Sequence, residues 1–261
     1  MDTAHRAPLI DGVLPRKAVT VLSGPTGIGK STIALDWAGH MVNDEDWYGH
    51  TIDDWYNDKP YSVVYITGQD WDSLGQRLKA WEKNHDGMIV DSLGFVDGVT
   101  AGVDMSEKGM GFCLVEELKN LDPDLVIFDS FSTLTNSKLT NDKEEVAKVF
   151  ERARNLVDAL DTAVLFVHHD DSLSEYADAV VTVNKDSYNP GCFYLSTEEE
   201  DGGKVLDMEP LRIDGFKSNT SGVLVREYTT VVVEDDASVP TKVKSVPTRD
   251  NLSASLRDMF T

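Results

Sequence analysis

The sequence has few cysteines, few basic residues and no long apolar run. Each shortage excludes or disfavours a class of protein or of binding site. Its two cysteines, Cys113 and Cys192, lie too far apart for a metal-ligand motif, which indicates buried thiols in a reducing cytoplasm. No apolar stretch reaches the roughly 18 residues that a transmembrane helix needs. The N-terminal residues MDTAHRAPLIDG carry no secretory pattern. We therefore expect a cytoplasmic protein with no targeting segment and no membrane partner.

Basic residues are scarce relative to acidic ones. The chain has 24 Lys and Arg against 46 Asp and Glu, which gives a formal net charge of −22. Such a field repels a polyanion at long range, so any nucleic-acid site must be a local basic or backbone-lined patch, or be completed by assembly. The acidity also fits a solubility or salt-adaptation trait, and by itself it assigns no function.

Strand-like and helix-like segments alternate along the chain up to residue 183, which is typical of an α/β fold with a mostly parallel sheet. Strands are predicted at 18–23, 61–67, 93–96, 124–129, 162–167 and 177–183, and helices at 30–42, 72–81, 105–120 and 142–160. The pattern then changes to short strands separated by turns, which we interpret as antiparallel additions to one sheet edge, at 192–197, 204–213 and 222–233.

The chain is predicted to form one domain over residues 1–233, followed by a tail. Residues 234–261 begin as a polar linker and end in a short segment with one apolar helical face. That face would either dock on its own domain or bind a protein partner.

A glycine-rich turn joins the first predicted strand to the first predicted helix. Residues 24–31 read GPTGIGKS and match the phosphate-binding pattern G-x-x-x-x-G-K-[ST] without a mismatch. The backbone N–H groups of such a turn cradle phosphate oxygens, and the helix N-terminus adds the positive end of its dipole. The predicted nucleotide-binding residues are Gly24, Pro25, Thr26, Gly27, Ile28, Gly29, Lys30, Ser31 and Thr32.

The side chains of this turn predict ATP with Mg²⁺ as the ligand. Lys30 supplies a positive charge for the β- and γ-phosphates, and the Ser31 hydroxyl can bind the metal. Asp129, at the end of a later apolar strand, is expected beside the turn, where its carboxylate can hold the water shell of Mg²⁺. An Asp that only caps the next turn is the alternative, and the matching phosphate-binding turn upstream argues against it.

With these motifs the chain resembles the RecA-like ATPases related to the plasmid helicase RepA, which are kin to DnaB-type helicases and to KaiC. The resemblance rests on the segments PLIDGVLPRKAVTVLSGPTGIGKSTIALDWA, DWYGHTI, SVVYITGQDWDSLGQRLKAW, DLVIFDSFSTL and TAVLFVHHDD. It covers about residues 7–185. It implies a RecA-like P-loop fold, ATP at a subunit interface, and a homo-oligomer in the form of a hexameric ring or a filament.

The chain departs from the family where the catalytic base is expected. The family usually has a Glu after the second strand, which activates the attacking water, whereas Gln69 and then Asp70 stand here. A glutamine can orient a water molecule but cannot accept its proton near neutral pH. Asp70 can substitute if the loop shifts by one residue.

A second departure concerns the group that reaches the neighbouring subunit's γ-phosphate. The family usually places a Lys-x-Arg pair late in the chain, and here Lys217 is kept while Asn219 replaces the arginine. An arginine finger can be worth roughly 10³–10⁵ in rate, so hydrolysis is expected to be slow. Arg212 and Arg226 stay open as substitutes.

Two histidines end the strand predicted at 162–167. In the resembling family the residue at this place senses the γ-phosphate, and we assign that role to His169 rather than to His168. A metal site formed by His-His-Asp-Asp is disfavoured, because consecutive strand residues point to opposite faces.

The residues give little evidence for nucleic-acid binding. The polar loop 135–143 could hold phosphates through Lys138 and Lys143, whereas the acidic loop 170–176 could not. The loop 43–60 could stack bases on its aromatic side chains, although a lid or a subunit contact fits it better. These side chains are Trp47, Tyr48, Trp55 and Tyr56.

The resemblance favours an ATP-driven motor on single-stranded DNA, as a replicative helicase or recombination motor of phage or plasmid type. Gln69, Asn219 and the acidic surface favour the alternative, a nucleotide-dependent assembly or regulatory ATPase with weak hydrolysis.

Overall fold

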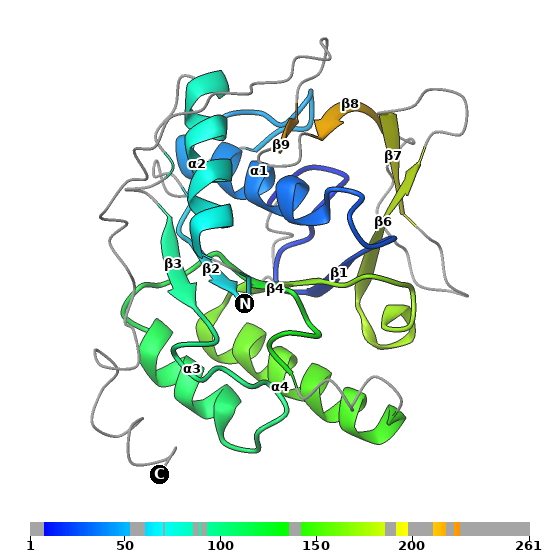
Figure 1. Cartoon of the computed structure of the whole chain (residues 1–261). Helices are drawn as coiled ribbons and strands as arrows, with labels where there is room; N and C mark the ends of the chain where they lie inside the picture. Colours follow the sequence, from blue (N-terminus) through cyan, green and yellow to red (C-terminus); the bar gives the residue numbers. More distant parts are fainter. Residues whose placement is uncertain are drawn as a thin grey trace, which may run out of the picture.

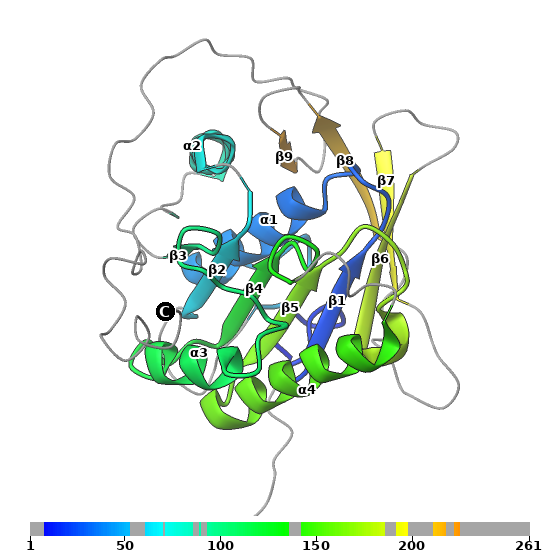
Figure 2. The same ribbon diagram turned by 60° about the horizontal axis from the view of Figure 1, so that its bottom comes forward.

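The computed structural model describes residues 8–52, 61–69, 71–85, 89, 93–135, 142–185, 192–197, 211–217 and 222–224. Among them, no helix combines the length and the apolar character that crossing a membrane requires. The described strands form one nine-stranded sheet in the order β3-β2-β4-β5-β1-β6-β7-β8-β9. Figure 1 shows the elements around this sheet, and Figure 2 labels all of its strands. The predicted tail, 234–261, lies outside the described residues.

The six sheet neighbours β3, β2, β4, β5, β1 and β6 run parallel to one another, as predicted from the alternation of strand-like and helix-like segments. They are β1 (Val19–Ser23), β2 (Val63–Thr67), β3 (Gly94–Asp97), β4 (Leu125–Asp129), β5 (Ala163–Val167) and β6 (Ala179–Lys185). Every residue of β1, β2, β4 and β5 is buried, as expected for a parallel sheet covered on both faces.

The register of the parallel strands brings several functional segments to one edge of the sheet. Thr67 of β2 pairs with Asp129 of β4, and Asp129 pairs with Val167 of β5. The phosphate-binding turn starts directly after Ser23, at the end of β1. In an open α/β sheet, ligands bind outside these carboxyl ends.

Antiparallel strands extend the sheet beyond β6, which confirms the prediction for the C-terminal part. They are β7 (Cys192–Thr197), β8 (Leu211–Lys217) and β9 (Gly222–Leu224). Of the strand predicted at 204–213, residues 211–213 belong to β8, which continues to Lys217. Residues 204–210 lie outside the described part of the chain. The last strand, β9, lies against α1 and α2.

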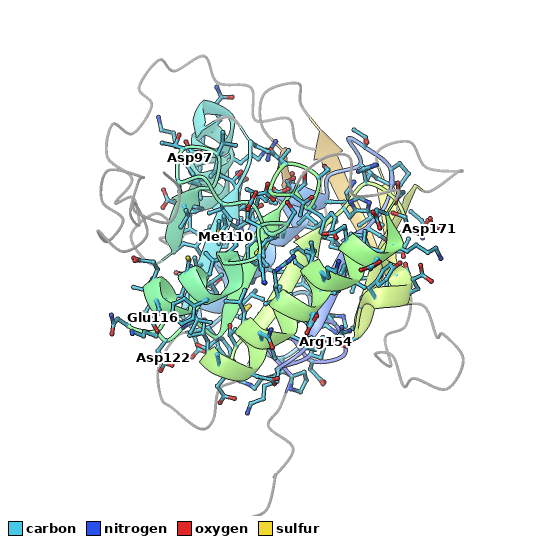
Figure 3. All side chains as sticks on the ribbon, turned by 90° about the horizontal axis from the view of Figure 1, so that it is seen from below. Asp97, Met110, Glu116, Asp122, Arg154 and Asp171 are labelled. Atoms are coloured by element: carbon cyan, nitrogen blue, oxygen red, sulfur yellow. The ribbon has the colours of Figure 1, made fainter. Side chains whose placement is uncertain are left out.

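Helices cover both faces of the sheet, and a separate apolar core fills each side (Figure 2). One face carries α1 (Lys30–Asn43) and α2 (Trp71–His85), whose core includes Trp37, Trp47 and Trp81. The other face carries α3 (Met110–Leu118) and α4 (Lys143–Leu160), whose core includes Phe128, Phe131, Phe150 and Phe166. The outer surface of α3 and α4 carries exposed charged side chains such as Glu116 and Arg154 (Figure 3), and α3 also exposes Phe112.

The predicted helix at 142–160 is confirmed nearly to the residue. Asp142 is its N-cap and accepts hydrogen bonds from the backbone N–H groups of Glu144 and Glu145. The apolar stripe predicted from the spacing is buried, namely Val146, Val149, Phe150, Ala153, Leu156, Val157 and Leu160.

The predicted start of the third helix, at 105, is wrong. The side chain of Asp104 accepts hydrogen bonds from the N–H and the hydroxyl of Ser106, and Met105 N–H donates to the carbonyl of Leu134. These bonds hold the segment as a turn, because short polar side chains compete with the helix for backbone groups. The helix begins only after Gly109.

Replacing Phe150 with alanine tests the packing of α4. The Phe150 ring lies 5.3 Å from Phe166, 6.1 Å from Phe131 and 5.6 Å from Tyr176, measured between ring centroids. We expect Phe150→Ala to lower the free energy of unfolding by about 3–5 kcal/mol in urea denaturation. The neighbouring Glu151 is exposed, so Glu151→Ala should change it by less than about 0.5 kcal/mol. Equal losses in both variants would contradict this packing.

Candidate nucleotide-binding site

The loop between β1 and α1 has a backbone that glycine alone adopts without strain. Gly24 has φ 139°, and a Cβ at this position would lie 2.5 Å from the carbonyl oxygen of Val183 on β6. Gly29 has φ 109° and is the N-cap of α1. Since Gly29 has no side chain, it cannot satisfy the amide groups of the first helical turn. These amides remain suited to an anion at the helix N-terminus.

Lys30 is held over this loop rather than extended into solvent. Its ammonium donates to the carbonyl oxygens of Gly24 (2.6 Å) and Pro25 (2.9 Å), and the residue is buried. At the tip of the loop Pro25, Thr26 and Gly27 are exposed. The positive charge therefore sits inside the loop, beside exposed backbone.

Asp129 is buried at the end of β4 and is surrounded by hydrogen-bond donors. The Ser31 hydroxyl donates to Asp129 Oδ1 (3.0 Å), and the Tyr65 hydroxyl, from the neighbouring strand β2, donates to Oδ2 (2.6 Å). Burial raises the pKa of the Asp129 carboxyl, while the bonds from Tyr65 and Ser31 oppose that shift. A carboxylate and a hydroxyl are oxygen donors of the kind that Mg²⁺ prefers.

Gln69 joins this group. Its amide nitrogen lies 2.9 Å from Ser31 Oγ and 3.2 Å from each oxygen of Asp129, and it donates to them. Its amide oxygen accepts a hydrogen bond from Arg77 on α2 (3.0 Å). The structure thus brings together three predicted residues, Ser31, Gln69 and Asp129. Asp70 lies outside the described residues.

The two histidines after β5 differ sharply in their surroundings. The His168 side chain is fully buried, with Nε2 3.0 Å from Asp170 Oδ1 and 3.2 Å from Ser172 Oγ. Burial lowers its pKa to about 4, against the raising effect of Asp170, and the charge of Lys30 adds to the lowering. The His169 side chain is about half exposed, with Nε2 3.3 Å from Asp170 Oδ2. The sensing role assigned to His169 stays a prediction.

The prediction that His168 and His169 point to opposite faces of a strand is wrong. The strand β5 ends at Val167, so the alternation of strand side chains does not apply to the residues that follow. The two imidazole rings lie only 4.3 Å apart. His168, His169 and Asp170 each offer a ligand atom, all within 4.8 Å of one another.

Other predicted residues lie apart from this site or outside the description. Lys217 closes β8, but its side chain is not among those described. Lys143 forms an ion pair with Glu175 (2.9 Å), and Lys138 falls outside the described residues. Trp47 is buried within its own domain, as expected for a lid rather than for a surface that stacks bases. Trp55 and Tyr56 lie outside the described residues.

Sequence reasoning missed two residues of the site, Tyr65 and Arg77. Tyr65 carries a hydroxyl group in the otherwise mostly apolar strand VVYIT. A buried tyrosine hydroxyl needs a hydrogen-bond partner, and this need could have indicated a nearby polar site. Arg77 comes eight residues after Gln69 on a separate element. Its approach depends on how α2 lies over the sheet, which a sequence pattern does not specify.

A family model described as an AAA domain (AAA_25) matches residues 2–172, which is more than half of the chain. The matched segment contains the phosphate-binding loop, Gln69, Asp129 and both histidines. No curated protein matches the chain.

The buried His168 should make stability depend on pH. Its pKa is about 4 in the folded chain and roughly 6.5 in the unfolded chain, so the unfolded chain binds more protons between these values. Stability contributed by the neutral ring is therefore lost as pH falls from 6.5 towards 4. We expect urea unfolding to show about 2 kcal/mol more loss between pH 7 and pH 5 for the wild type than for His168→Gln. The variant His50→Gln, which removes a histidine from a different loop, should keep the wild-type dependence. An unchanged dependence in His168→Gln would refute the assignment.

Proposed function

Because the chain belongs to the AAA-domain family of P-loop ATPases, we propose that residues 24–31 bind ATP and that Ser31 and Asp129 hold its Mg²⁺. The observation that carries this proposal is the 3.0 Å contact between Ser31 Oγ and Asp129 Oδ1. It places a hydroxyl of the phosphate-binding loop on a buried carboxylate from a distant strand. Bound Mg²⁺ would supply positive charge to the β- and γ-phosphates.

The chain's own residues have distinct tasks in this proposal. The N-terminal amides of α1 and the Lys30 ammonium bind the phosphates, and Lys30 exchanges the loop carbonyls for phosphate oxygens. Asp129 and Ser31 turn their oxygens to the metal. In the structure Gln69 donates to those same oxygens, so its amide nitrogen would have to move away when the metal binds. The hydrogen bond from Arg77 to the amide oxygen of Gln69 would remain.

We further propose that the protein is an oligomeric motor acting on single-stranded DNA, in replication or recombination. The support for this step is the resemblance to RepA-like helicases over about residues 7–185. In a ring or filament, Lys217 would reach the γ-phosphate of the nucleotide in the next subunit. His169 would sense the γ-phosphate of the nucleotide bound at residues 24–31 of its own chain.

One observation favours a second candidate, a nucleotide-dependent assembly or regulatory ATPase that hydrolyses slowly. Gln69 stands where a general base is expected, and its amide is tied to Ser31, Asp129 and Arg77. An amide in this position cannot accept the proton of an attacking water near neutral pH.

Turnover measured with and without single-stranded DNA distinguishes the two candidates. A motor should hydrolyse ATP faster when DNA is added, and Lys30→Ala should abolish both calorimetric Mg·ATP binding and turnover. Lys119→Ala, an exposed change just after the end of α3, should leave both unaltered. ATP-dependent oligomers without stimulation by DNA would support the regulator. Wild-type protein that binds no Mg·ATP would refute both.

Gln69→Glu tests whether the missing base limits the rate. A carboxylate here can take the proton of the attacking water, and general-base catalysis typically contributes about 10²–10⁴-fold. We expect the turnover number to rise by at least about 10-fold. Gln76 on α2 is exposed, so Gln76→Glu is a control of identical charge change and should have no effect. An unchanged rate in Gln69→Glu would show that another group, such as Asp70, acts as the base.

A further inference from the structure

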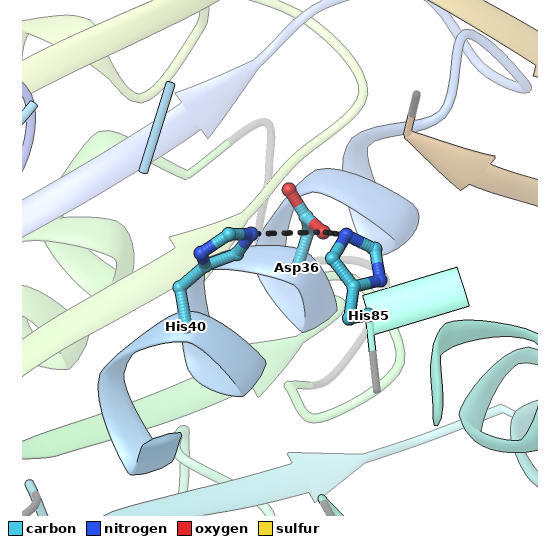
Figure 4. A group of neighbouring side chains, drawn as sticks. All are labelled: Asp36, His40 and His85. Atoms are coloured by element: carbon cyan, nitrogen blue, oxygen red, sulfur yellow. Dashed lines mark ion pairs between the residues drawn. The ribbon is translucent and has the colours of Figure 1, made fainter. Parts of the chain in front are cut away.

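A second group of polar side chains is buried between α1 and α2, apart from the nucleotide-binding residues. It consists of Asp36 and His40 on α1 and His85 at the end of α2 (Figure 4). The side chains are 0%, 10% and 14% exposed, respectively. Asp36 lies about 9 Å along the helix from Lys30. The ATPase site uses none of these three residues, so their burial needs a separate explanation.

Both imidazole rings direct the same nitrogen at one carboxylate oxygen. Asp36 Oδ1 lies 3.8 Å from His40 Nε2 and 3.6 Å from His85 Nε2, as the dashed lines in Figure 4 mark. Ligand atoms from the three residues all lie within 4.8 Å of one another. In a tetrahedral zinc site with bonds of about 2.0–2.1 Å, ligand atoms are about 3.3 Å apart. To share one ion, the two nitrogen–oxygen distances would therefore need to shorten by about 0.3–0.5 Å, and the two imidazole ligand atoms, which lie within 4.8 Å of each other, would need to approach by up to about 1.5 Å.

The hydrogen bonds around His85 leave a lone pair facing the carboxylate. Its Nδ1 lies 3.0 Å from the backbone carbonyl oxygen of Trp81, which can only accept a hydrogen bond, so Nδ1 carries the proton. In the neutral ring, Nε2 then presents its lone pair to Asp36. A metal-bound histidine typically has this arrangement, with the second nitrogen donating to a carbonyl or carboxylate.

His40 lacks the partners that a buried imidazole normally has. Within the described part of the chain, neither of its ring nitrogens has a hydrogen-bond partner. A buried polar atom without a partner is costly, and an unseen water or ion is a common explanation. Because Asp36 and His40 are four residues apart on α1, they share one helical face, a spacing also found in zinc sites.

The carboxylate itself is held in place by two indole groups. Trp47 Nε1 donates to Asp36 Oδ2 and Trp81 Nε1 donates to Oδ1, each at 2.8 Å. These bonds fix the orientation of the carboxylate and leave a lone pair of Oδ1 towards the histidines. Two charged imidazoles are the competing explanation. Imidazolium N–H groups would be expected to approach a carboxylate to about 2.7–2.9 Å, which is closer than either histidine lies.

We propose that Asp36, His40 and His85 form a binding site for a divalent transition-metal ion, with Zn²⁺ as the best fit. Two imidazoles and one carboxylate are a ligand set that zinc accepts, and a water molecule would complete four-coordination. The ion would fasten the end of α2 to α1. Since α2 also carries Arg77, the metal would fix the helix whose arginine holds Gln69.

Metal titration of chelator-treated, full-length protein tests this site. Calorimetry should show one Zn²⁺ bound per chain, and Co²⁺ should give the visible absorption of a four-coordinate ion. His40→Gln and His85→Gln should each weaken binding by more than about 10-fold. His50→Gln, which removes a partly buried histidine outside this cluster, should bind as the wild type does. Circular dichroism and Mg·ATP binding would show that each variant is folded.

The outcomes separate this site from the histidines after β5. Loss of Zn²⁺ binding in His169→Gln but not in His85→Gln would assign the ion to the other cluster and overturn the proposal. Absence of Zn²⁺ and Co²⁺ binding would overturn it as well. If the His40 and His85 variants fail to fold, X-ray absorption of zinc-loaded His169→Gln decides, because this variant leaves one imidazole in the cluster after β5. Two imidazoles per zinc support the site, and one or none refutes it.

Discussion

The buried carboxylate of Asp129 is the constraint around which the nucleotide-binding end of the sheet is organised. A carboxylate taken out of water is unfavourable unless hydrogen bonds or opposite charge compensate it. Here the compensation comes from Ser31, Tyr65 and Gln69, which reach Asp129 from the start of α1, from β2 and from the loop after β2. One side chain therefore ties the phosphate-binding loop to the centre of the sheet, and Arg77 extends the same network to α2.

A second buried carboxylate, Asp36, lies in the middle of α1 and accepts hydrogen bonds from two neighbouring elements. The indole N–H groups of Trp47, from the loop that follows α1, and of Trp81, from α2, both donate to Asp36. The aromatic core on this face therefore contains a buried carboxylate. The backbone of Gly39 lets Trp81 approach closely, because a Cβ there would lie 2.5 Å from the indole ring. As a result, α1 is held at its first turn by Asp129 and at its middle by the indoles. The position of the loop before Lys30 depends on both.

The predictable and unpredictable parts of the structure differ in physical origin. The helix α4 and the strand ending at Asp129 follow from the period of apolar residues, and the phosphate-binding turn follows from a fixed local pattern. The start of α3 was missed because Asp104 stabilises a turn that the apolar pattern does not reveal. Arg77 and the contrast between His168 and His169 were missed for another reason. They depend on where α2 lies and where β5 stops, which only tertiary packing decides.

The glutamine at position 69 links the stability of the site to its chemistry. A glutamate there would bring a second carboxylate to about the 3.2 Å that now separates the Gln69 amide from Asp129. A negative charge at that distance from a buried carboxylate is strongly repelled. The neutral amide instead donates to Asp129, so it stabilises the site before a cation is bound. Under the proposed function, the same amide cannot accept a proton from the attacking water. Such a site would be stable before Mg²⁺ binds and slow in hydrolysis. A glutamate would act as a base only while bound Mg²⁺ neutralises Asp129.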